Sequence, residues 1–229
     1  MKKMTIHMFV LLFMSCSTIV FSQTDISLFG GNYISGTKST MLGTEFIQLD
    51  PIYSFSGGLI VKHHLSDQIA VRSGLNYQKR GFSFTEGTSI DVFGIDIPLG
   101  VEVRNEINYL EVPLMLEYKI PVNSSIQPYI AGGLAFAYGM NGNLTTRAQT
   151  ILDFNVTNTA LNLSSNDYNR VDISTQLMAG VQIPSGNSHF LVELGYGQAI
   201  NDFISDDFFL DAGGKHFGWQ MNVGYGIRF

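Results

Sequence analysis

The last eleven residues of the chain, Trp219 to Phe229, constrain the fold more than any other segment. They read WQMNVGYGIRF, so every second residue is large and apolar, and the residues between are polar or glycine. Alternation with a period of two places successive side chains on opposite faces of a β-strand. A tilted strand needs about 9–11 residues to cross a membrane. The segment therefore predicts a strand with one face in an apolar medium; the alternative is the last strand of a soluble β-sandwich.

The N-terminus indicates an exported chain. Two lysines precede a short apolar core at residues 8–14, and Val20 and Ser22 occupy the third and first positions before a cut at Gln23. This order is typical of a cleaved signal peptide. We therefore expect residues 1–22 to be removed and residues 23–229 to form one domain.

Cys16 offers an alternative to simple cleavage, because residues 13–16 half-resemble a lipobox. The apolar run continues past the cysteine at residues 19–21, which favours cleavage without a lipid anchor. If the cut precedes Gln23, the mature chain contains no cysteine, which excludes disulfides and thiol chemistry.

The composition favours β-structure and argues against nucleic acid as a partner. The whole chain has 13 basic and 19 acidic residues. Removing residues 1–22 takes two lysines, so the mature balance is 11 minus 19, or −8. Without a run of basic residues, binding to nucleic acid is not expected. The 24 glycines, 17 phenylalanines and 10 tyrosines suit strands joined by short turns.

Short and long connections alternate along the chain. Tight polar turns are expected at residues 64–68, 121–125 and 184–188. Longer connections are expected at residues 35–52, 83–105, 140–167 and 200–214. Bacterial outer-membrane barrels have short periplasmic turns and long extracellular loops. Three short and four long connections join eight strands and leave both termini on the periplasmic side.

The two faces of the expected strands have opposite character. Between Leu110 and Ile120, every second residue is apolar, and Glu111 and Glu117 lie on the other face. The apolar faces together are too extensive for one interior, so we place them against lipid and the charges inside. The fold class predicted from this pattern is all-β: an eight-stranded antiparallel up-and-down transmembrane β-barrel.

An eight-stranded barrel is just wide enough for side chains to fill its interior. Charges confined there must pair, so we predict a luminal ion-pair network and no catalytic residue. Within it, Arg72 and Glu117 are expected to pair in the periplasmic half, with Glu193 as a further partner. An acid–base pair among the luminal glutamates is the alternative. The network comprises Lys62, Arg72, Glu111, Glu117, Glu193 and Arg228.

Pro113 is unusual because it falls inside an expected central strand. Proline removes a ladder donor and is normally found at edges or bulges. We therefore predict a bulge or a ladder break at Pro113. Tyrosines near strand ends are expected to form interfacial girdles; these are Tyr33, Tyr77, Tyr118, Tyr138, Tyr196 and Tyr225.

Neither a metal site nor a cofactor is predicted. His63 and His64 are adjacent, so their side chains face opposite sides of a strand. His189 is expected to be solvated at a turn, and His216 lies at the outer start of the last strand. The acids Asp202, Asp206, Asp207 and Asp211 suit either a solvated loop or a Ca²⁺ site, although their spacing matches no EF-hand.

Three segments carry a family resemblance: YLEVPLMLEY at residues 109–118, QPYIAGG at 127–133 and VELGYG at 192–197. Together they resemble the PorT-type outer-membrane β-barrel family, one branch of which takes part in protein secretion. The resemblance implies a location in the outer membrane. The strand ending on phenylalanine also resembles the signal read by the barrel-assembly machinery. By this resemblance the signal comprises Trp219, Val223, Tyr225, Ile227 and Phe229.

We expect a monomeric, non-enzymatic barrel that contacts outer-membrane lipid and a protein partner. Its outer loops or its periplasmic rim would then act as an interaction or secretion-accessory surface. One alternative is a small barrel enzyme acting on lipid or peptide, for which His216 is the only histidine expected near the outer leaflet. The other is a narrow diffusion channel, although eight strands leave no aqueous pore.

Overall fold

The computed structural model describes residues 23–39, 49–92, 95–149, 154–164, 168–203 and 214–229, so the expected signal peptide lies outside the described residues. Among these residues, no helix is long and apolar enough to cross a membrane. The described strands are β1 Thr24–Ser39, β2 Asp50–His64, β3 Ile69–Val92, β4 Ile95–Lys119, β5 Gln127–Gln149, β6 Phe154–Ala160, β7 Val171–Ser185, β8 Ser188–Ala199 and β9 Gly214–Arg228.

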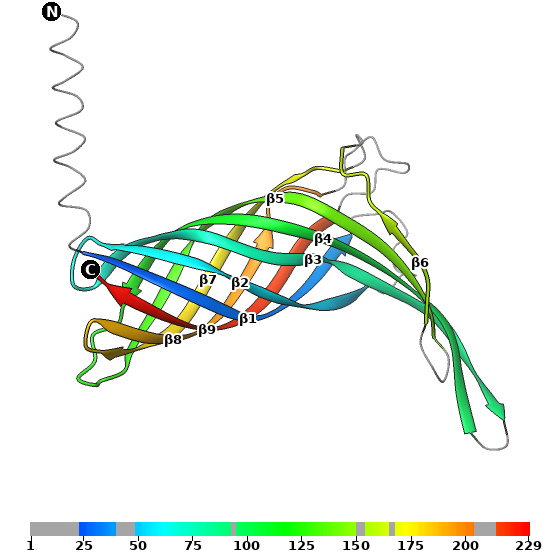
Figure 1. Ribbon diagram of the computed structural model, residues 1–229, viewed down its shortest axis with the longest axis horizontal. Coiled ribbons are helices and arrows are strands. Elements are labelled where there is room, and N and C mark those ends of the chain that lie inside the picture. The colour runs from blue at the N-terminus through cyan, green and yellow to red at the C-terminus, as the bar shows by residue number, and fades with distance from the viewer. Residues whose placement is uncertain (1–22, 40–48, 93–94, 150–153, 165–167, 204–213) are drawn as a thin grey trace, which may run out of the picture.

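Eight of these strands form a closed ring. The sheet order is β4-β3-β2-β1-β9-β8-β7-β5-β6, and a further pairing of β4 with β5 closes it. All neighbours are antiparallel, and β6 pairs with β5 outside the ring. Figure 1 shows the resulting barrel, with the C-terminus at the end that carries the short turns. The predicted eight-stranded up-and-down barrel is confirmed, and β6 is an additional strand.

The last strand closes the barrel against the first. β1 and β9 pair in continuous register from Asp25 opposite Arg228 to Ser39 opposite Gly214. The Phe229 amide then donates to the Thr24 carbonyl at 3.0 Å. The alternating C-terminal segment therefore supplies the seam of the ring.

The three short turns fall where the sequence predicts them. They connect β2 to β3, β4 to β5 and β7 to β8. In the β7–β8 turn, Gly186 has a φ of 62°, a left-handed conformation that glycine adopts without a steric penalty. These turns lie at the same end of the barrel as the start of β1 and the end of β9. Short turns mark that end of the barrel as periplasmic.

Two connections expected to be long loops are largely strand, so that expectation is wrong for residues 83–105 and for much of 140–167. β3 and β4 contain 24 and 25 residues, far more than the about 9–11 that cross a membrane. Their pairing continues to Val92 opposite Ile95, whereas β2 pairs with β3 only as far as Ser83. Figure 1 shows β3 and β4 running past the ring together with β5 and β6.

Hydrogen-bonded neighbours on both edges of β4 and β5 explain why the parts of these strands beyond the ring stay extended. β5 pairs with β4 as far as Gln149 and with β6 from Asn143 to Ala148. A cross-strand charge pair supports the same arrangement, since Arg147 lies 3.9 Å from Glu102, its register partner. We call the part beyond the ring, residues 84–103 and 142–160, the projecting sheet.

The assignment of the two faces is confirmed along β4. Leu114 and Leu116 are 56% and 55% exposed, whereas Met115 between them is 3% exposed. Tyr33 is an exception to the predicted girdle, because it shares its parity with Asp25 and points into the lumen, where it is buried. A Cβ on Gly218 would lie 2.3 Å from the Tyr33 hydroxyl, so glycine at 218 makes room for that ring.

Pro113 interrupts the ladder without forming a bulge. The β3–β4 register is the same on both sides of the gap, from Ser73 opposite Leu114 to Asn76 opposite Glu111. The Ser73 hydroxyl donates to the Pro113 carbonyl at 2.8 Å, which replaces part of the lost pairing. Of the two predicted outcomes, the ladder break at Pro113 is present and the bulge is not. The register shift in β4 lies at Asn108/Tyr109, against β5.

Candidate functional site

The lumen is filled by polar side chains that are buried from both water and lipid. They come from inward-facing positions of seven of the eight ring strands, because one residue in two points into a closed barrel. The exception is β5, whose buried side chains are Tyr129 and three alanines. The charges are arranged in three layers between the periplasmic turns and the outer end.

The periplasmic layer is centred on Asp25, whose side chain is fully buried. Arg228 donates to both carboxylate oxygens, through Nε at 2.8 Å and Nη2 at 3.1 Å. Nε2 of His64 lies 3.0 Å from Oδ2 of Asp25. Asp25 thus connects β9 and β2 through β1, at the seam where the first and last strands meet.

The middle layer contains two linked ion pairs. Lys62 donates to Glu117 at 3.1 Å and to the Gln182 amide oxygen at 3.4 Å. Arg72 donates to both oxygens of Glu193, with the Nη2 contact at 2.9 Å. All four charged side chains are at most 4% exposed. Removing one partner from such a buried pair costs roughly 3–5 kcal/mol, because the other charge is left uncompensated.

The outer layer is built around Arg80. This residue contacts Glu111 through Nη2 and Asp172 through Nη1, the latter at 2.6 Å. Three amide side chains complete the solvation of Glu111: Asn76 at 3.2 Å, Gln78 at 2.9 Å and Gln176 at 2.9 Å. A carboxylate with this many donors is held in place and is not available to a substrate.

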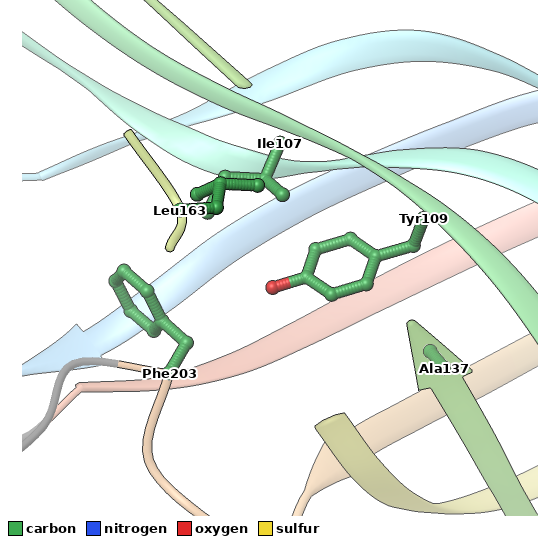
Figure 2. Packing of buried hydrophobic residues seen from close by; sticks show 5 residues of the cluster. All are labelled: Ile107, Tyr109, Ala137, Leu163 and Phe203. Carbon is green, nitrogen blue, oxygen red and sulfur yellow. The ribbon is translucent and has the colours of Figure 1, made fainter. Parts of the chain in front are cut away.

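An apolar cluster covers the outer layer. Its members are Ile107, Tyr109, Ala137, Leu163 and Phe203, and Figure 2 shows the Tyr109 hydroxyl pointing toward Leu163 and Phe203. Phe203 stacks on His216 with ring centroids 4.1 Å apart, and His216 Nδ1 lies 3.0 Å from Asp172. We call these five residues the outer cap; they lie over the charged lumen at its extracellular end.

The residues expected in the luminal network are distributed over the three layers. Glu111 contacts Arg80, which was not part of the expected set, and Arg228 contacts Asp25. Arg72 lies 3.7 Å from Glu117 without a hydrogen bond. Its hydrogen-bonded partner is Glu193, the residue expected only to share the pair.

Sequence reasoning missed Asp25, Arg80, Asp172 and His216 as members of the network. Parity could have identified them. Arg80 has the same parity as Arg72 on β3, and Asp172 has the same parity as Gln176 on β7. His189 is buried, which contradicts the expectation that it is solvated at a turn, and His216 is buried as well.

The six alternating apolar residues of β9 and its C-terminus face outward. Trp219 and Val223 are both 57% exposed, and Phe229 is 59% exposed. Tyr225 and Ile227 lie on the same face. This surface is available to lipid.

The described part of the site offers no metal centre. Within the described ranges, no group of three or more His, Cys, Asp or Glu side chains could hold a metal ion. Asp206, Asp207 and Asp211 of the acidic loop lie outside the described residues. The His216–Asp172 pair resembles half of a catalytic triad, but its imidazole packs between the rings of Tyr109 and Phe203. Its geometry suits structural pairing.

Comparison with known proteins agrees with this architecture. Residues 21–205 match the family described as outer membrane protein beta-barrel domain. No curated protein sequence matches the chain. OprG from Pseudomonas aeruginosa is similar in structure, with 15% identity, a TM-score of 0.45, and coverage of 91% of this chain and 97% of OprG. Neisserial surface protein A has 10% identity and a TM-score of 0.44, and the match covers 89% of this chain and 97% of that protein.

Proposed function

Because this chain belongs to the outer membrane protein beta-barrel domain family, we propose that it is a closed, non-enzymatic barrel that binds a protein partner through its projecting sheet. Its place in the outer membrane follows from the family and from the lipid-facing wall. The observation that carries the partner-binding role is that β3 to β6 extend past the membrane. The filled lumen carries the non-conducting role.

The filled lumen supports the non-conducting half of the proposal. Three charged layers and the outer cap occupy the path that an ion would take. Opening that path would separate buried ion pairs, each costly to break. A diffusion channel is therefore disfavoured.

The projecting sheet supports the interaction half of the proposal. It carries charged side chains, with Arg147 of β5 3.9 Å from its register partner Glu102 of β4. A rigid scaffold that holds an extended surface clear of the membrane is a common way to present a binding site. The periplasmic rim, suggested by the resemblance to a secretion-associated family, is the second candidate surface. The cavity of 520 Å³ beside the periplasmic turns favours it.

Site-specific photo-crosslinking in living cells distinguishes the two surfaces. The photoreactive residue is placed at Val101 on the projecting sheet or at Val122 in the β4–β5 turn, which are 47% and 46% exposed. We expect a discrete protein adduct from Val101. An adduct only from Val122 would assign the role to the periplasmic rim, and adducts from neither position would contradict an interaction role.

A further inference from the structure

A cavity of about 520 Å³ lies at the periplasmic mouth of the barrel. Residues of the β2–β3 and β4–β5 turns line it, together with Arg228 at the end of β9. The Lys119 amide donates to the Gln68 carbonyl at 2.8 Å, which holds the two turns side by side. Sites for small ligands commonly have volumes of about 300–1,000 Å³, so this cavity is large enough for a short peptide segment.

Lys119 brings a positive charge to this cavity that the described part of the chain does not pair. It has the same parity as Glu117 on β4, so it faces the lumen, and it is half-buried. The nearby carboxylates are already bonded, since Glu117 accepts from Lys62 and Asp25 accepts from Arg228. Within the described ranges, the Lys119 ammonium has no hydrogen bond and no ion pair. A partly desolvated cation without a partner is costly, so an anion in the cavity would stabilise it.

Arg228 provides a second donor to the same cavity. In the described contacts it uses Nε and Nη2 for Asp25, which leaves Nη1 for another acceptor. His64 also lines the cavity, and Asp67 is its one acidic lining residue. Asp67 is exposed in the β2–β3 turn and forms no ion pair with the described cations. The mouth is therefore locally positive in a chain whose formal net charge is −6.

The apolar part of the lining narrows the class of anion. Leu65, Ile120 and Val122 line the cavity and are exposed. A small inorganic anion would leave these side chains in water, whereas an apolar side chain next to the anionic group would cover them. Lys119 and Arg228 both have inward parity, so a lipid headgroup in the surrounding bilayer lies on the wrong side of the barrel wall. These features fit a peptide carboxylate that approaches from the periplasm.

We propose that this cavity binds an acidic peptide through one carboxylate, with an apolar side chain of the peptide next to it. Lys119 Nζ and Arg228 Nη1 donate to the carboxylate in charge-assisted hydrogen bonds. Leu65 and Val122 contact the apolar side chain. The site lies at the end of the barrel opposite the projecting sheet, so it goes beyond the partner binding proposed for that sheet and does not depend on it.

Fluorescence anisotropy of labelled peptides, titrated with the mature barrel in detergent micelles, tests the proposal. The first probe carries rhodamine at its N-terminus and ends in Gly-Ser-Ala-Leu with a free carboxylate. The second has the same sequence with an amidated end, and the third has the amidated end with Asp in place of Ala. We expect saturable binding of one peptide per barrel for the first or the third probe, and binding at least about tenfold weaker for the second. Binding of the first probe identifies a chain end as the source of the carboxylate, and binding of the third identifies an internal acid.

Two results with the wild-type barrel would overturn the proposal. One is equal affinity for all three probes, or saturable binding of none of them. The other is displacement of the bound probe by inorganic phosphate at the same concentration as unlabelled peptide, because the cavity would then accept any small anion.

Lys119→Gln is the test variant, because Lys119 has no partner in the described chain whose charge would be left unpaired. We expect the Kd of the carboxylate probe to rise by roughly tenfold or more. Lys215→Gln is the matched control, since it removes the same charge at the other end of β9. Urea unfolding should give both variants the midpoint of the wild type, which separates lost binding from lost folding. Unchanged affinity in Lys119→Gln, or equal weakening in the two variants, would contradict a specific site.

Discussion

Arg72 on β3 and Glu193 on β8 form a bidentate ion pair across the full width of the lumen. In the ring order, three strands separate β3 from β8 on the side of the seam: β2, β1 and β9. The pair therefore connects opposite walls and does not merely reinforce one hairpin. This relationship makes the barrel interior part of the fold's stability.

Glu193→Gln should lower the free energy of unfolding by roughly 3–5 kcal/mol, because the buried Arg72 loses its hydrogen-bonded counter-charge. Urea titration of the barrel in lipid vesicles measures this change. The control is Glu102→Gln on the projecting sheet, where the partner Arg147 is 38% exposed, and the cost should stay below about 1 kcal/mol. Equal losses of unfolding free energy in the two variants would show that the luminal pair stabilises the barrel no more than the exposed pair does.

A double-mutant cycle should also rank the partners of Arg72. Coupling to Glu193 should exceed coupling to Glu117, because Glu117 lies 3.7 Å away and is hydrogen-bonded to Lys62. The sequence alone predicts that Arg72 couples more strongly to Glu117, and the same cycle tests that prediction. Additive losses for Arg72 and Glu193 would contradict a direct pair.

The barrel should show no stable porin-like conductance in planar bilayers, and Phe203→Ala should not create one. Phe203 belongs to the outer cap, but Arg80 and its carboxylate partners lie beneath it. Removing the cap alone therefore leaves the charged layers in place. Large, stable channels in either protein would contradict the closed lumen.

The faces of the strands could be predicted because parity is a local property. Once Leu116 is placed against lipid, Glu117 must point inward. The partners of each charge could not be predicted, because they depend on which strands lie opposite and at what height. Arg72 reaches Glu193 across the lumen, and no pattern within β3 or β8 specifies that distance.

Other errors share a physical cause. The sequence predicts a loop at residues 83–105, because the thickness of a membrane limits the length of a crossing strand. In the structure, β3 and β4 continue to pair beyond the membrane. At Pro113 a bulge or a ladder break was possible, because proline removes a donor. Only the break occurs, since the Ser73 hydroxyl compensates without a change of register. Both outcomes depend on neighbouring strands and not on the local residues.

The mature protein should begin at Gln23 and carry no lipid. The order of charged, apolar and small residues before that position is typical of signal-peptide cleavage. The intact mass of protein purified from outer membranes measures this directly. A mass that includes residues 16–22 and acyl groups on Cys16 would contradict it.

The side chain of Phe229 should be needed for insertion, separately from the closing of the barrel seam. Its backbone amide donates to Thr24, and Phe229→Ala keeps that bond while removing a ring that is 59% exposed. If the ring is part of the assembly signal, heat-modifiable protein in the outer membrane should fall several-fold and the periplasmic pool should rise. Phe190→Ala is the matched control, since it removes a lipid-facing ring that is 53% exposed on β8. A general requirement for aromatic contact with lipid would affect both variants alike, and unchanged insertion of Phe229→Ala would remove the C-terminal ring from the signal.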